Sequence, residues 1–154
     1  MAAGGVYVIG GAQSDFGRNL FREGLEISDL VAATVADTLD DAGVAPEQVE
    51  SVHVGNAFGQ LFNGQGHLGA LPATVIPELW GVPAMRHEAA CASGSIAVLA
   101  AMAEIEAGRY DCVLVLGVEQ GRNGPGDVAA RHLGAAAWVG HEGVEAKFLW
   151  PALF

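Results

Sequence analysis

The sequence is poor in charge and poorest in basic residues. Only 16% of its 154 residues are charged, and seven Lys and Arg stand against eighteen Asp and Glu, a net charge of −11. Nucleic acids and anionic membrane surfaces are bound through clustered Lys and Arg, so this balance argues against both kinds of partner. The apolar fraction of 51% excludes intrinsic disorder. A chain this apolar is expected to hide part of its surface against something else.

Cysteine and long apolar runs are also scarce. Cys91 and Cys112 are the two cysteines, and no CxxC spacing joins them, so neither a zinc site nor a redox pair is predicted. The opening segment 1–18 has no basic region before its apolar stretch, which predicts no secretion signal. No apolar run approaches the ~20 residues of a membrane-spanning helix. We therefore expect a cytoplasmic protein without a membrane span or a metal.

What the sequence does contain is an alternation of strand and helix patterns. The predicted strands cover 6–9, 49–54, 84–88 and 112–116. The predicted helices cover 28–43, 72–79 and 96–107, with a shorter one near Asp127. This alternation predicts an α/β fold with a mainly parallel sheet, in a chain about one domain long.

Several element ends carry specific signals. Ser28 is the expected N-cap of the first helix, and Gly43 is its expected C-terminal glycine. The helix over 96–107 is apolar nearly all round, which predicts a central helix buried on every side. The segment 55–71 is too rich in glycine for a regular element and predicts a loop with a short helix.

The most informative motif is HEAACASGS at 87–95. It predicts a strand that turns tightly into a helix, with Cys91 at or near the helix N-terminus. Unpaired N–H groups and the helix dipole favour a thiolate there, and small neighbours leave room for a reacting group. Such a turn is the geometry of a nucleophile elbow, suited to covalent acyl transfer. The alternative is that Cys91 is an inert core cysteine, a common fate for a lone cysteine.

The motifs together resemble the thiolase superfamily, most closely the sterol-carrier-protein-type, acetyl-CoA acetyltransferase-like thiolases. The segments that carry the resemblance, in the expected order, are VYVIGGAQSDFGR, LDDAG with VHVGN, GQGHLG, EAACASGS and CVLVLGVE. The resemblance implies a thiolase-like fold, of which this chain is the amino-terminal layered α/β half. Residues 1–119 would be that half with its nucleophile helix, and 120–154 the start of a loop domain, truncated relative to the family.

The resemblance also implies a chemistry. Cys91 would accept an acyl group from acyl-CoA, and a second acyl-CoA would then condense with it, or a 3-ketoacyl-CoA would be cleaved in reverse. Coenzyme A thioesters would be substrates, with no permanently bound cofactor. The family's activating His and second acid/base residue belong to a carboxy-terminal half, so this chain alone is expected to be inactive. A homo-oligomer, dimer or tetramer, with the Cys112 strand at its interface is implied, together with a missing half or companion chain.

The remaining polar residues give weaker signals. None of the five histidines is predicted to be the catalytic base: His87 lies on a strand, and His53 points to the polar side of another. Glu119 is expected to hold loop geometry, and Cys112 to be structural. Two other functions stay open: a non-catalytic thiolase-like subunit that scaffolds or binds acyl-CoA for a partner, and a ketoacyl synthase of the same superfamily.

Overall fold

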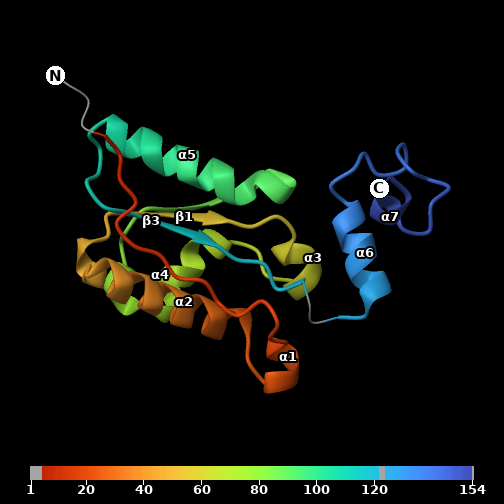
Figure 1. Ribbon diagram of the computed structural model, residues 1–154, viewed down its shortest axis with the longest axis horizontal. Helices are drawn as coiled ribbons and strands as arrows, with labels where there is room; N and C mark the ends of the chain where they lie inside the picture. Colours follow the sequence, from red (N-terminus) through yellow and green to blue (C-terminus); the bar gives the residue numbers. More distant parts are fainter. Residues whose placement is uncertain (1–4, 122–123, 154) are drawn as a thin grey trace.

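A three-stranded parallel sheet forms the centre of the protein. In the computed structural model, which describes residues 5–121 and 124–153, the strands are β1 (Ser51–Gly55), β2 (Ala84–His87) and β3 (Val113–Gly117), in the order β2-β1-β3. Helix α5 (Ser93–Glu106) covers one face, and α2 (Ile27–Ala42) with α4 (Leu71–Val75) covers the other (Figure 1). The predicted α/β fold with a parallel sheet is confirmed.

Shorter elements surround these layers. The other α-helices are α1 (Leu20–Glu23), α3 (Gly59–Asn63), α6 (Gly126–Gly134) and α7 (Leu149–Leu153). Single 3₁₀ turns cover Pro46–Gln48, Leu68–Ala70, Pro77–Leu79 and Ala90–Ala92. Helices α6 and α7 lie to one side of the sheet, beyond α3 (Figure 1). No helix in the described part of the chain has both the length and the apolar character needed to cross a membrane.

Local signals set most helix ends, with two differences from the prediction. Helix α2 ends at Gly43 as expected, in the left-handed conformation with φ +63°, but a capping box of Glu26 and Asp29 starts it instead of Ser28. The helix predicted over 72–79 is interrupted at Ile76, because Pro77 disfavours helical backbone at the residue before it.

The main hydrophobic core lies between the sheet and the α2 layer. Its members alternate along β1 and β3 and recur on one face of α2, and they include Val31, Val35, Val52, Val54, Leu68, Leu79, Leu114 and Leu116. Each of these side chains is less than 9% exposed. Burial of this apolar surface is the main stabilising contribution to the fold.

In the part of the chain that the structure describes, α5 alone covers the opposite face of the sheet. Ala97 and Ala101 of α5 are buried, whereas Val98 and Leu99 are 43% and 58% exposed. The prediction that this helix is buried on every side is therefore wrong for the described chain. The reason is that the sheet covers one side of α5, and no other segment among the described residues covers the opposite side (Figure 1).

The strand predicted over 6–9 does not form. Residues 6–9 are extended but belong to no sheet, and Tyr7 and Val8 are 79% and 93% exposed. A groove of about 340 Å³, lined by residues of this segment, α2, α5 and β3, separates the segment from the edge of β3. Without ladder hydrogen bonds to β3, the β-branched pattern alone does not make a strand.

Candidate active site

Cys91 lies in the turn that joins β2 to α5. Strand β2 ends at His87, a 3₁₀ turn covers Ala90–Ala92, and α5 begins at Ser93. The sequence predicted this strand–turn–helix arrangement, and the structure has it. Cys91 is exposed, so its sulfur is accessible to a reacting molecule.

The turn itself is strained and held in place by hydrogen bonds. Ala90 has φ +48°, a left-handed conformation that is unfavourable for any residue with a Cβ. Its N–H donates to Glu88 Oε1 at 2.6 Å, and its carbonyl accepts from Ser93 Oγ at 2.7 Å. The N–H of Ala89 donates to Ser93 Oγ at 3.0 Å. Contacts on both sides of Ala90 thus fix the position of the next residue, Cys91.

The neighbouring loop after β1 is held from two sides. Glu119, which follows β3, accepts hydrogen bonds from the N–H groups of Ala57 and Phe58 at 3.0 and 3.1 Å. Arg86 of β2 donates to the carbonyls of Asn56 and Ala57 at 3.0 and 2.8 Å. The expected role of Glu119 in loop geometry is confirmed. Sequence reasoning missed Arg86, although a basic residue within an apolar strand is a detectable signal.

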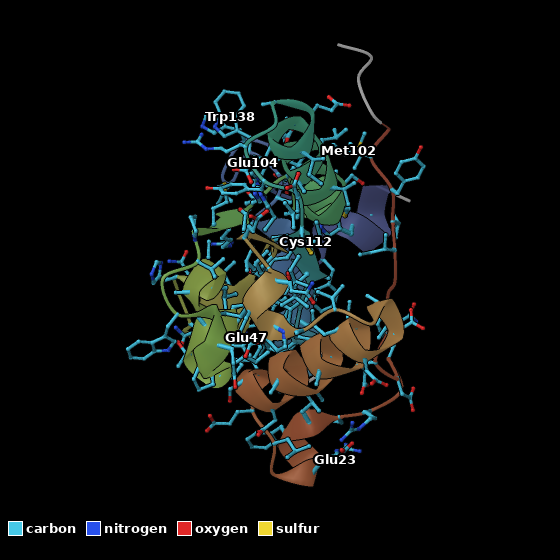
Figure 2. All side chains as sticks on the ribbon, turned by 90° about the vertical axis from the view of Figure 1, so that its left-hand side faces the viewer. Glu23, Glu47, Met102, Glu104, Cys112 and Trp138 are labelled. Carbon is cyan, nitrogen blue, oxygen red and sulfur yellow. The ribbon has the colours of Figure 1, made fainter. Side chains whose placement is uncertain are left out.

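A buried histidine pair lies beneath α5. His53 does point away from the face of Val52 and Val54, as predicted, but α5 covers that side and His53 is 0% exposed. Its Nδ1 lies 2.8 Å from His87 Nε2, and its Nε2 lies 2.8 Å from Glu104 Oε2. Figure 2 shows Glu104 on the helix layer that covers the sheet. Sequence reasoning missed this cluster, because a single glutamate on an apolar helix gives no sign of which distant side chain it contacts.

The surroundings of this cluster shift the ionisation of its members. Burial, followed by the nearby His53, lowers the pKa of His87, while Glu104 acts weakly in the opposite direction. Burial raises the pKa of Glu104, but hydrogen bonds from His53 and Ser51 outweigh it and leave that pKa below its ordinary value. Glu104 is therefore ionised and His87 is neutral near pH 7.

The remaining histidines and Cys112 make no contact with this cluster. His67 and His141 are exposed, and His141 stacks on Trp138 with ring centroids 4.0 Å apart. His132 packs edge-on against Phe62. Burial and Glu50 raise the pKa of the Cys112 thiol, which fits a structural residue. Among the described residues, no group of three His, Cys, Asp or Glu side chains is arranged to hold a metal ion.

Comparisons with known proteins identify the family to which the chain belongs. The family description "Thiolase, N-terminal domain" matches residues 6–140, so the chain belongs to the thiolase family. It is 36% identical over 118 residues to an acetyl-CoA acetyltransferase of Methanocaldococcus jannaschii, covering 75% of this chain and 28% of that protein.

Two further relatives match the same region. An acetyl-CoA acetyltransferase of Methanothermobacter thermautotrophicus is 33% identical over 115 residues, which cover 75% of this chain and 29% of that protein. The non-specific lipid-transfer protein-like 2 of Caenorhabditis elegans is 31% identical over 123 residues, covering 80% of this chain and 28% of that protein. The matched region thus spans less than a third of the length of these curated relatives.

Proposed function

We propose that this protein takes part in thiolase-type acyl transfer on acyl-CoA thioesters, with Cys91 as the residue that carries the acyl group. The observation that carries the proposal is the position of Cys91. It is exposed in a strained strand-to-helix turn, within the region that matches the thiolase family. Two relatives in that region are named acetyl-CoA acetyltransferase.

The proposed reaction has two steps. In the first, the Cys91 thiolate attacks the thioester carbonyl carbon, the bond from that carbon to the CoA sulfur breaks, and CoA leaves as a thiol after taking a proton. In the second, a second acyl-CoA loses an α-proton to a base that the proposed carboxy-terminal half would supply, and the resulting carbanion attacks the acyl-cysteine carbonyl and releases the Cys91 thiolate. The reverse direction is thiolytic cleavage of a 3-ketoacyl-CoA.

The turn favours the first step for physical reasons. Cys91 lies two residues before the start of α5, and the dipole of this 14-residue helix stabilises negative charge near its N-terminus. Ala92 and Gly94 are exposed and small, so a thioester can approach the sulfur. The hydrogen bonds around Ala90 keep the sulfur in one place before the substrate arrives.

The proposal includes an association partner and a cellular location. Ile96, Val98 and Leu99 expose apolar surface on α5 beside the catalytic turn, and large apolar patches mark interfaces. The proposed assembly is a homo-oligomer with the strand after Cys112, the edge strand β3, at its interface, and with a further half-domain or companion chain over the α5 surface. Both cysteines are free, as is usual in a reducing compartment, so the proposed location is the cytoplasm.

Intact-mass measurement after incubation with acetyl-CoA, and separately with a longer acyl-CoA, tests the role of Cys91. We expect one acyl group on Cys91 when the wild-type chain is assembled with the proposed carboxy-terminal half, none on Cys91→Ala in the same assembly, and one on the matched control Cys112→Ala. An acyl group retained by Cys91→Ala would assign the nucleophile elsewhere. A folded wild-type assembly with the carboxy-terminal half that gains no acyl group from either thioester would overturn the proposal and favour a non-catalytic acyl-CoA-binding subunit.

A further inference from the structure

We propose that Glu104, His53 and His87 form a hydrogen-bonded relay that takes up one proton at the exposed end of His87 and positions the Cys91 turn. The three side chains come from α5, β1 and β2 and meet beneath the helix. The choice of Cys91 as the positioned group rests on the proposed function. The relay itself rests on geometry alone.

The contacts fix where the hydrogens lie. An ionised carboxylate only accepts hydrogen bonds, so His53 Nε2, 2.8 Å from Glu104 Oε2, carries a hydrogen. In a neutral His53 the other ring nitrogen, Nδ1, is then an acceptor, and the hydrogen of the 2.8 Å contact belongs to His87 Nε2. This leaves Nδ1 of His87 with a free lone pair. That nitrogen has no hydrogen-bond partner in the part of the chain that the structure describes.

Uptake of one proton moves hydrogens between the rings of His87 and His53. An incoming proton binds His87 Nδ1, and the hydrogen on His87 Nε2 passes to His53 Nδ1. His53 becomes an imidazolium that donates to Glu104 on one side and to His87 Nε2 on the other. His87 stays neutral, but its Nδ1 has changed from acceptor to donor, and the positive charge lies beside a carboxylate.

The pair takes up one proton rather than two. The rings are stacked with centroids 5.0 Å apart and share one hydrogen across 2.8 Å, so two cations would repel each other strongly. The other elements facing the pair supply few charges. Beyond Glu104, the end of α5 brings Arg109 near that carboxylate, β1 contributes the neutral Ser51, and β3 presents Val115 beside His53. The following turn contributes Glu88.

The relay acts on Cys91 through the short backbone segment between His87 and Cys91. His87 is the last residue of β2, and its carbonyl accepts from Asn56 N–H at 3.1 Å, so both its backbone and its ring are anchored. The strained Ala90 follows three residues later, held on its far side by Ser93. Strain of this kind persists only where the surroundings hold it on both sides. His53, His87 and Glu104 are thus positioning residues, and a proton taken up by the histidine pair places a positive charge on the elements that hold the Cys91 turn.

Nitrogen-15 NMR of the histidine rings in the intact wild-type protein tests the relay directly. At mildly alkaline pH we expect hydrogen on Nε2 of both His53 and His87. On acidification both rings should shift together as one proton is added. Hydrogen on Nδ1 of either ring at alkaline pH, or two independent titrations, would overturn the proposal. The NMR measurement uses the wild-type protein and no acyl-CoA. A negative result would therefore overturn the relay without bearing on the proposed acyl transfer.

The pH dependence of Cys91 alkylation by iodoacetamide tests the link to the turn. Below about pH 6.5, the ordinary histidine range, we expect the wild-type rate to exceed that of Glu104→Gln by about five-fold or more, the scale of a typical coupling between sites. His87→Gln should resemble Glu104→Gln, and the exposed control His141→Gln should resemble wild type. Superimposable profiles for folded wild type and Glu104→Gln would overturn the coupling.

Discussion

The two faces of the parallel sheet are packed for different purposes. On the α2 face, β1 presents Val52 and Val54, both at most 1% exposed, to a continuous apolar core. On the α5 face the same strand presents Ser51, His53 and Gly55 to a helix whose outer side is open. One strand thus faces the apolar core on one side and supplies the buried His53 on the other, because alternate side chains point to opposite faces. The first face stabilises the fold through its apolar core, and the second holds the polar cluster for which we propose a role in positioning Cys91.

The largest expected effect is a loss of stability on truncating a core side chain, and it distinguishes the two faces of the sheet. Leu79 is 0% exposed in the α2-side core, and Leu79→Ala should lower the free energy of unfolding by ~2–5 kcal/mol. Leu99, 58% exposed on α5, is the matched control, and Leu99→Ala should change it by about 0.5 kcal/mol or less. Urea unfolding measures both. A cost for Leu99→Ala equal to that of Leu79→Ala would show that the outer side of α5 is covered in solution.

A smaller effect is expected at the close contact between β1 and α5. A Cβ at Gly55 would lie 2.8 Å from Gly94 Cα, a backbone atom that cannot move aside without shifting the helix. Gly55→Ala should therefore lower stability by ~1–3 kcal/mol and slow the alkylation of Cys91. Gly117, the register partner of Gly55 on β3, has no atom within 4 Å of such a Cβ. Gly117→Ala should leave both measurements unchanged, and equal effects at the two glycines would contradict this account.

Removing Glu119, one of the side chains that hold the loop after β1, should lower stability by a smaller amount. Glu119→Ala deprives the N–H groups of Ala57 and Phe58 of their acceptor, and water can replace it in part because Glu119 is exposed. We expect a loss of ~1 kcal/mol in thermal unfolding and faster amide exchange at these two residues. Glu47→Ala, another exposed glutamate (labelled in Figure 2), is the control. Unchanged exchange at Ala57 and Phe58 would remove Glu119 from the loop's support.

The smallest expected effect is a loss of stability at acidic pH, caused by His87 and Glu104 on the α5 face of the sheet. The pKa values of His87 and Glu104 are both lowered by the fold, so the unfolded chain binds more protons than the native protein at each group. Stability should be fully present above about pH 6.5. It should fall as a proton is forced through His87 onto the histidine pair, and fall again below about pH 4.5 as Glu104 is protonated. His87→Gln should remove the first step in unfolding measured against pH, and a first step that persists in this variant would assign it elsewhere.

The sequence by itself determined the local features of this protein. The strand patterns of 49–54, 84–88 and 112–116, the left-handed Gly43 and the turn that carries Cys91 were all predicted, because periodicity and capping act over a few neighbouring residues. The motif HEAACASGS also contributed to the predicted resemblance to the thiolase family, and the family match over residues 6–140 confirms that resemblance.

Only the tertiary structure decided what lies between distant segments. His53 and Glu104 are 51 residues apart, and their pairing depends on how α5 crosses β1. The segment 6–9 has the composition of a strand but no partner along β3, and α5 has the composition of a buried helix but a single covering layer. Hydrogen bonds and burial are made with neighbours in space, so a pattern along the chain can state what a segment prefers but not what it meets.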